Sequence, residues 1–353
     1  MRDDLTPVER KKAIREGRAV DRLPNLFTFE GAEAKAVGEK AGVFFSDPSV
    51  TAAATKAVYE RYEPDVVEIP GAPEGAIFGL ESVIPEDSNV YIKAPVNPTR
   101  EQIAAAGLGD AKTNPALQGF WGGLEAFGND YGSRGVEIGI LGAGPFSTAA
   151  QIVGVDSFLK KLVRDPEYVH LLLGKVTEMR VSFIQATAGL GVFFDIKDPV
   201  SSGSLISQKQ YREFAQPYQT RIFKAMQEAN PLQDHILHIC GDTSKIWEDM
   251  VDTGADIISI DNAMDLAEAK RRVGHIASIS GNIHPTQTML LGTPDDVERN
   301  YKECLRKAWD AKKTYVPDYG CGLPIGTPLE NLDRLFEVHR KYSSFPIDPE
   351  RLS

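Results

Sequence analysis

The sequence predicts an α/β fold, a single (β/α)8 TIM barrel that occupies residues 1–353. Two observations indicate it: eight short β-rich runs alternate with helical patterns, and no Pro- or Ser-rich linker divides the chain. An open, doubly wound sheet is the alternative. It is weakened because no G-x-G-x-x-G motif follows the first β-rich run.

The expected strands are short runs bounded by Gly, Pro or Asp and followed by helical patterns. The first and weakest candidate is 23–29, and the others are 65–70, 135–146, 191–199, 235–240, 256–261, 275–283 and 314–322. Because helices separate them, we expect parallel pairing and right-handed crossovers.

Helices are expected over about 6–17 at the N-terminus and over 207–230, 295–311 and 328–342. Thr293-Pro294 and Thr327-Pro328 are expected helix starts, with a capping hydroxyl followed by proline at the first helical position.

The Gly-rich region of about 105–135 is expected to be a long loop, which is either a lid near the site or a plain surface excursion. Its aromatic residues would suit a transient interface with a partner: Phe120, Trp121, Phe127 and Tyr131.

Composition excludes several classes of protein. The formal net charge is −11, and without a basic patch such a chain is not expected to bind nucleic acid. No apolar run is long enough to span a membrane, and the charged start lacks the apolar core of a signal peptide, so a cytoplasmic protein is expected. Three cysteines, an odd number, point to metal or thiol chemistry and not to a disulfide framework.

Reactive groups of a barrel lie at the carboxyl ends of its strands. His238 and Cys240 end one expected strand and, being two residues apart, share a face. Asp261 ends the next strand and Cys321 lies between glycines at the last one. An imidazole, two thiolates and a nearby carboxylate suit zinc. The alternative is that the cysteines only fill the core, which is what we expect of Cys304 within a helix.

Two further residues end the expected strand 191–199. Asp198 is expected at the mouth of the barrel, where it either orients substrate or cofactor or only caps a turn. Lys197 is a candidate cation for an anionic substrate, and the alternative is an ordinary exposed lysine.

Several ordered motifs carry a family resemblance: DRLP (21–24), GAGPFSTAAQIVG (142–154), HICGDTSKIWEDMVDTGADIISID (238–261), ISGNIHPTQTMLLGTPDDV (279–297) and YGCGLPIGTPLENL (319–332). Over nearly the whole chain they resemble the uroporphyrinogen decarboxylase superfamily, and this resemblance implies the same barrel.

The superfamily contains decarboxylases and corrinoid-dependent methyltransferases. Decarboxylases carry an Arg-rich M-R-Q-A-G-R-Y stretch, an Asp in F-S-D-I, a Tyr after G-P-F-T and a His near the last strand. The corresponding places here hold LPNLFTFEGAEAKAVG without arginine, VEIPG, Gln151 and Cys321. A negatively charged chain without that arginine is poorly equipped to hold a porphyrinogen, so decarboxylation is disfavoured.

The sequence is more similar to the methyltransferase branch, which includes methylcobalamin:coenzyme M methyltransferases. Their zinc motif, His-x-Cys and a distant Cys, matches His238, Cys240 and Cys321. Cobalamin-independent methionine synthase uses a similar motif with a carboxylate at the next strand end, which implies that Asp261 is a fourth ligand or a partner of the ligands. The resemblance thus implies Zn2+ as cofactor. It also implies methylcobalamin brought by a separate corrinoid protein, because the chain has no D-x-H-x-x-G motif.

Three functions remain open at this point. The first is a methyltransferase that passes the corrinoid methyl group to a zinc-activated thiol, and the second is the component of an O-demethylase that passes a substrate methyl group to Co(I). The third reading is a non-enzymatic subunit with a structural zinc. Two thiolate ligands weaken zinc as a Lewis acid, which favours the thiol methyltransferase.

Overall fold

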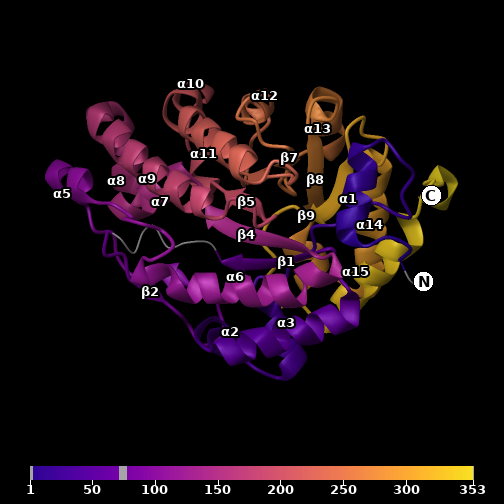
Figure 1. Cartoon of the computed structure of the whole chain (residues 1–353). Coiled ribbons are helices and arrows are strands. Elements are labelled where there is room, and N and C mark those ends of the chain that lie inside the picture. Colours follow the sequence, from indigo (N-terminus) through magenta and orange to yellow (C-terminus); the bar gives the residue numbers. More distant parts are fainter. Residues whose placement is uncertain (1–2, 71–77, 353) are drawn as a thin grey trace.

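The computed structural model describes residues 3–70 and 78–352, and seven parallel strands form one curved sheet inside a layer of helices (Figure 1). The order is β1-β4-β5-β6-β7-β8-β9, and each strand pairs in parallel with the next. The strands are β1 (Val66–Pro70), β4 (Glu137–Ala143), β5 (Phe193–Lys197), β6 (Ile236–His238), β7 (Ile257–Ser259), β8 (Ser278–Ile283) and β9 (Tyr315–Tyr319). A separate short hairpin joins β2 (Ser82–Val83) and β3 (Tyr91–Ile92). The predicted fold class, a barrel of the (β/α)8 type, is confirmed.

The eighth place of the barrel is filled by the segment 23–29, which lies between β9 and β1 but is not a strand. Leu26 N–H donates to Pro317 O of β9 (3.2 Å), and Asn25 N–H donates to Asp65 Oδ2 just before β1 (2.9 Å). Burial alternates residue by residue along the segment, as in a strand. Pro24 and Pro317 have no N–H to donate, so a full ladder does not form, and the prediction of a first strand here is wrong.

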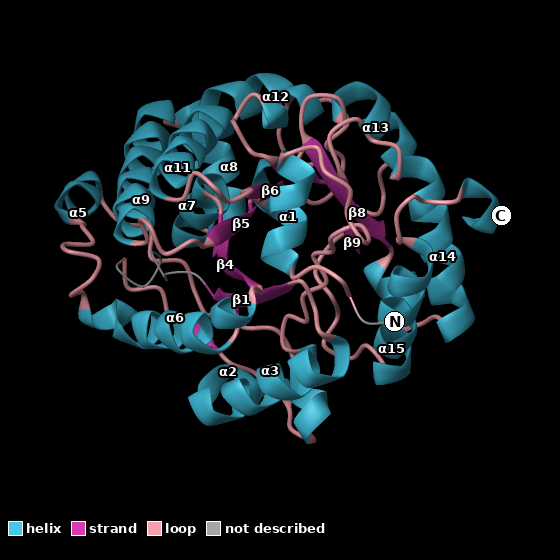
Figure 2. Cartoon of the chain, turned by 45° about the vertical axis from the view of Figure 1, so that its right-hand side comes forward, coloured by secondary structure: helices cyan, strands magenta, loops and turns pink. Residues whose placement is uncertain are grey.

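Helices surround the sheet (Figure 2). They are α1 (Pro7–Arg15), α2 (Ala41–Ser46), α3 (Pro48–Tyr62), α5 (Arg100–Ala105), α6 (Gln118–Asp130), α7 (Pro145–Val153), α8 (Val155–Arg164), α9 (Pro166–Ala186), α10 (Gln208–Gln210), α11 (Gln216–Ala229), α12 (Trp247–Val251), α13 (Leu266–Val273), α14 (Pro294–Ala308) and α15 (Leu329–Tyr342). A short π-helix, Tyr211–Ala215, links α10 to α11 within the predicted helix 207–230.

The two predicted helix starts have different outcomes. Thr293 caps α14, where its hydroxyl accepts from the N–H of Asp296 (3.3 Å). Thr327 does not cap α15, because its hydroxyl donates to the carbonyl of Pro324 (2.7 Å) and the helix begins at Leu329.

The Gly-rich region 105–135 is mostly helical, so the prediction of a long loop is wrong. Helix α6 covers residues 118–130, with short 3-10 turns before and after it. Its aromatic side chains pack inward: the rings of Phe120 and Trp121 lie 4.9 and 5.6 Å from that of Phe183 in α9. Leu117, Phe120, Trp121 and Leu124 follow a helical spacing and pack against the core. Their burial outweighs the low helix propensity of the glycines, about 1 kcal/mol each.

The inside of the barrel changes from apolar to polar along five of the strands. On five strands an inward apolar residue forms part of a small separate core: Val66, Phe193, Ile236, Ile257 and Val316. Two positions later, on the same face, stand Glu68, Asp195, His238, Ser259 and Asp318. The apolar layer therefore separates the N-terminal end of the barrel from a polar C-terminal end.

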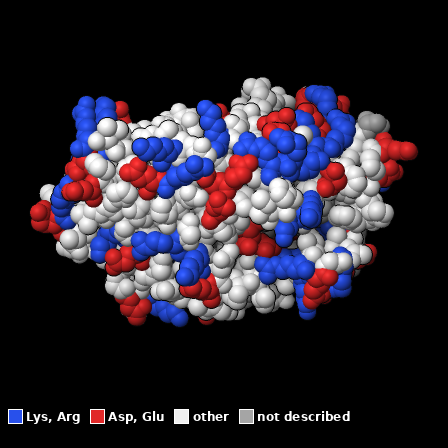
Figure 3. Space-filling model, turned by 90° about the horizontal axis from the view of Figure 1, so that it is seen from above, with Lys and Arg blue, Asp and Glu red and all other residues white. Residues whose placement is uncertain are grey.

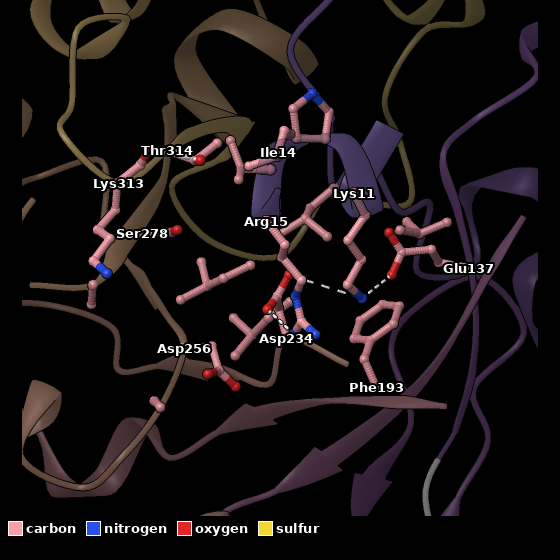
Figure 4. Close-up of a pocket in the computed structure, with 18 of the residues that line it drawn as sticks. Lys11, Ile14, Arg15, Glu137, Phe193, Asp234, Asp256, Ser278, Lys313 and Thr314 are labelled. Atoms are coloured by element: carbon pink, nitrogen blue, oxygen red, sulfur yellow. Dashed lines mark hydrogen bonds and ion pairs between the residues drawn. The ribbon is translucent and has the colours of Figure 1, made fainter. Parts of the chain in front are cut away.

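Helix α1 lies across the N-terminal end of the barrel (Figure 2). Figure 4 shows Lys11 of this helix directed at Glu137 (2.5 Å) and Arg15 directed at Asp234 (2.5 Å). They line a cavity of about 550 Å³ whose inner wall includes the apolar layer. The described helices include none that is both long and apolar enough to cross a membrane.

Candidate metal centre

Three side chains converge at the C-terminal end of the barrel. His238 ends β6, Cys240 follows two residues later, and Cys321 lies two residues after β9. The Nε2 atom of His238 is 3.0 Å from the Cys240 sulfur, which is 3.1 Å from the Cys321 sulfur. The three ligand atoms all lie within 4.8 Å of one another, and we call these residues the His–Cys–Cys cluster.

Two glycines allow the chain to present the cysteines in this way. Gly241, directly after Cys240, has a φ of +79°, a conformation that favours glycine, and turns the chain at the strand end. At Gly320, directly before Cys321, an added Cβ would lie 2.3 Å from the backbone nitrogen of Asn262. Replacing Gly320 would therefore push the second cysteine away from its partners.

The cluster fits a zinc ion by the chemistry of its donors. One imidazole nitrogen and two sulfurs are ligands that zinc prefers. The Nδ1 atom of His238 lies 2.9 Å from Ser259 Oγ, which leaves Nε2 facing the cysteines, the arrangement usual for a ligating histidine. His238 is buried, whereas both cysteines are partly exposed, so the cluster is open on one side. Three protein ligands with an open position are typical of catalytic zinc.

The thiols of the cluster are electrostatically unequal. Hydrogen bonds from the Cys240 thiol and from His238 lower the pKa of Cys321 to about 4. The hydrogen bond to Cys321, together with burial, raises the pKa of Cys240. One sulfur therefore already has thiolate character, which is the form that binds metals.

Asp261 lies beside the cluster but is not one of its three converging groups. Its Oδ2 accepts from Gly241 N–H (2.8 Å) and its Oδ1 from Ala263 N–H (2.7 Å). The carboxylate thus ties the turn after Cys240 to the loop after β7. This geometry favours the role of a partner that positions a ligand over that of a fourth ligand.

Asp198 stands at the strand end, as expected, but its side chain is fully buried and turned toward the helices. One oxygen accepts from Ser147 N–H in the first turn of α7 (2.6 Å), and the other accepts from Gln219 Nε2 of α11 (2.8 Å). Burial raises the pKa of this carboxyl, although these bonds oppose the effect. The contacts favour the capping alternative over contact with substrate.

A second group of charged residues lies beside the cluster, and of these sequence reasoning identified only Lys197. A small cavity of about 20 Å³ is bordered by His238 and Cys321 on one side and by Glu30, Asp195, Lys197, Asp318 and Tyr319 among its other residues. We call Glu30, Glu68, Asp195 and Asp318, which surround Lys197, the acidic chamber.

Lys197 belongs to this chamber and is not the exposed lysine that was the alternative. Its Nζ lies 2.5 Å from Glu30 Oε1 and 3.8 Å from Asp195 Oδ2. Burial lowers the pKa of Lys197, but the charges of Glu30 and Asp195 outweigh that effect and raise it, so the ammonium form persists.

Three carboxyls of the chamber have raised pKa values. Burial, followed by the charge of Asp195, raises the pKa of Glu68 and of Asp318 well above the usual range. Burial also raises the pKa of Asp195 itself. The signal that could have found Glu68, Asp195 and Asp318 is a period of two, because each stands two positions after an inward apolar residue of its strand.

Cys304 is the contrasting case. It is buried in α14 among core residues, as predicted, and lies outside the His–Cys–Cys cluster.

Comparison with known proteins gives two kinds of relative. A family model described as uroporphyrinogen decarboxylase (URO-D) matches residues 6–342. A "Uroporphyrinogen decarboxylase" of Synechococcus sp. is 30% identical over 271 residues, which are 74% of this chain and 73% of that protein. The "Methylated-thiol--coenzyme M methyltransferase" of Methanosarcina mazei is 34% identical over 190 residues, 53% of this chain and 48% of that protein.

A further relative is the "Methylcobamide:CoM methyltransferase MtbA" of Methanosarcina mazei, 34% identical over 211 residues, 59% of this chain and 60% of that protein. The matches thus span between about half and 60% of the two methyltransferases. Among solved structures, a "methyltransferase from Methanosarcina mazei" has a TM-score of 0.80 at 23% identity, over 96% of this chain and 99% of that chain. This last match shows a shared fold.

Proposed function

The chain belongs to the uroporphyrinogen decarboxylase family, and from this premise we propose that it is a zinc-dependent methyltransferase. It moves a methyl group between a corrinoid and a small substrate, with a thiol as acceptor. The corrinoid is methylcobalamin or a relative of it, carried by a separate protein that binds transiently.

The observation that carries the proposal is the convergence of His238, Cys240 and Cys321 within 4.8 Å, open on one side. These residues would hold the zinc ion. When bound there, the ion would keep an incoming thiol in its thiolate form at neutral pH, where a free thiol of pKa near 8.5 is only about 3% ionised.

The residues of the chain position this reaction. Ser259 holds His238 by its Nδ1 atom, and Asp261 fixes the backbone directly after Cys240. The buried Asp198 secures the start of α7 at the same end of the barrel. The corrinoid, brought by its carrier, would give up its methyl group to the substrate sulfur and keep the electron pair of the cobalt–carbon bond, so that Co(III) would become Co(I).

The acidic chamber supports this function over decarboxylation of a porphyrinogen. A substrate with several carboxylates would place like charges beside Glu30, Asp195 and Asp318, which is unfavourable. On the face of the molecule drawn in Figure 3, Lys and Arg are interspersed with Asp and Glu.

The experiment mixes the purified protein with methylcobalamin and a small thiol, and follows the cobalt absorption spectrum as Co(I) appears. We expect Cys321→Ser to slow methyl transfer by more than about 100-fold. Cys304→Ser is the matched control and should react like the wild type. Equal rates for wild type and Cys321→Ser would refute the proposal. It would also be refuted if a methoxyaromatic compound methylated Co(I) while no thiol accepted a methyl group from methylcobalamin, which is the O-demethylase direction.

A further inference from the structure

We propose that the acidic chamber binds a primary ammonium group at the non-reacting end of the small substrate. The substrate is then an aminothiol or a similar cationic compound and not a sulfonate. The placement of the reacting sulfur at the His–Cys–Cys cluster rests on the proposed function, whereas the binding of a cation in the chamber does not.

Charge is the first argument. Four carboxyl groups, Glu30, Glu68, Asp195 and Asp318, surround one cation, Lys197. Lys197 is paired with Glu30, so it is not available to an anionic ligand. A bound cation would favour the ionised form of Asp195 and Asp318, whose pKa values are raised by burial and by neighbouring carboxyls, whereas a sulfonate would add to that repulsion.

Unused hydrogen-bonding atoms are the second and independent argument. The Oε2 of Glu68, the Oδ1 of Asp195 and the hydroxyl of Tyr319 are buried and have no hydrogen-bond partner. Tyr319 is only 4% exposed, and both it and Asp195 line the small cavity. Buried polar atoms are costly to leave unpaired, so a site with several of them awaits a ligand. A primary ammonium has N–H donors for the oxygens of Asp195 and Tyr319, the two of these residues that line the cavity.

Size is the third argument. The cavity of about 20 Å³ has room for one group of the size of a water molecule, since a water needs roughly 10–15 Å³ by this measure. An –NH3+ group meets that limit, whereas a trimethylammonium or a sulfonate group exceeds it. A divalent cation is also a poor fit, because within residues 3–70 and 78–352 only the His–Cys–Cys cluster brings three metal-ligand atoms together.

Because His238 and Cys321 border the same cavity, an ammonium group in it would lie next to the cluster, and the carbon chain of a short substrate would follow the open side of the cluster. Its thiol would lie at the cluster and its ammonium in the chamber. The chamber would thus select the substrate, and the cluster would activate it.

The test compares thiols that share a carbon chain and differ in the terminal group: 2-aminoethanethiol, 2-mercaptoethanol and 2-mercaptoethanesulfonate, with the three-carbon homologues of each. Binding is measured on cobalt(II)-substituted protein by the thiolate-to-cobalt absorption band, without corrinoid. We expect the aminothiols to bind at least about 10-fold more tightly than the alcohols and sulfonates. Asp318→Asn should reduce this preference about 10-fold, and Asp252→Asn, an exposed carboxylate, is the control.

A second measurement is independent of the metal. Calorimetric titration of the protein with n-propylamine and with propane-1-sulfonate should detect binding of the amine only, and Asp318→Asn should weaken it. Equal affinity for the three terminal groups, or preference for the sulfonate, would overturn the proposal. If aminothiols bind selectively but no thiol accepts a methyl group, the chamber stands and the proposed function fails. If all thiols accept it with equal affinity, the function stands and the chamber proposal fails.

Discussion

The two ends of the barrel differ in how their buried charged groups are paired. At the N-terminal end, Asp65 accepts hydrogen bonds from both Arg10 (2.8 Å) and Arg22 (2.7 and 2.8 Å), while Lys11 and Arg15 pair with Glu137 and Asp234. At the C-terminal end four carboxyls share one lysine, and two of their oxygens have no hydrogen-bond partner.

This difference separates stability from function. Matched ion pairs hold α1 and the segment before β1 against the bottom of the barrel. Unmatched carboxyls and converging thiols are unfavourable for folding and are retained at the end where barrels carry their active sites. Cavity size alone would mislead, because the 550 Å³ cavity lies at the N-terminal end and the 20 Å³ cavity lies beside the cluster.

The largest expected effect on stability is at the N-terminal end. Asp65→Asn removes the charge shared by Arg10 and Arg22, whose side chains are 0% and 3% exposed, and we expect a loss of about 3–5 kcal/mol in the free energy of unfolding. Urea denaturation measures it. Asp234→Asn breaks a pair whose side chains are about one-third exposed and should cost less than about 1 kcal/mol. Similar losses for the two variants would remove the distinction between buried and peripheral pairs.

A smaller effect is expected at the C-terminal end, on metal affinity. Ser259→Ala deprives His238 of its Nδ1 partner and should weaken zinc binding about 10–100-fold, because the ring is no longer held in place. Competition with a chelator of known affinity measures it. Ser280→Ala, in the next strand, removes a buried hydroxyl without a partner and should leave zinc affinity unchanged. If both variants bind zinc like the wild type, Ser259 does not position the histidine.

The smallest effect concerns the pH dependence of stability. Burial and the charge of Asp195 raise the pKa of Glu68 well above 4.5 in the folded protein. The folded form therefore binds a proton that the unfolded chain releases near its ordinary pKa, and the wild type loses stability as the pH rises above that value. Glu68→Gln cannot ionise, so it should gain stability relative to the wild type between pH 5 and pH 8.

Thermal unfolding over that pH range tests this expectation. The exposed Glu125→Gln serves as control and should show no such trend. A constant difference between wild type and Glu68→Gln would mean that Glu68 is ionised in the fold, and the contrast between the two ends would be weakened.

Much of the fold could be predicted because apolar runs and helical spacing alternate along the chain, and the pair His238 and Cys240 shares a face by simple strand geometry. The segment 23–29 could not, since its prolines preserve the extended shape but remove the ladder. Helix α6 was hidden by its glycines, although Leu117, Phe120, Trp121 and Leu124 follow a helical spacing.

Side-chain direction within strands explains the remaining differences. The side chains of Phe193, Asp195 and Lys197, which are two residues apart, all point into the barrel. Asp198 directly follows Lys197, so its side chain points the other way, toward the helices. The same parity places Glu68 and Asp318 inside the barrel. Amino-acid composition does not reveal this placement. A single carboxylate in an apolar strand can be assigned to the inside of the barrel only when the inward face of that strand is known.

The most direct test of the account is the zinc content of the protein, measured by plasma emission spectrometry together with activity. We expect one zinc per chain in the wild type and in Cys304→Ser. In Cys240→Ser and Cys321→Ser we expect almost no zinc and a folded barrel with unchanged circular dichroism. A zinc-free wild type that transfers methyl groups at the full rate would contradict the assignment of the C-terminal end as a zinc centre.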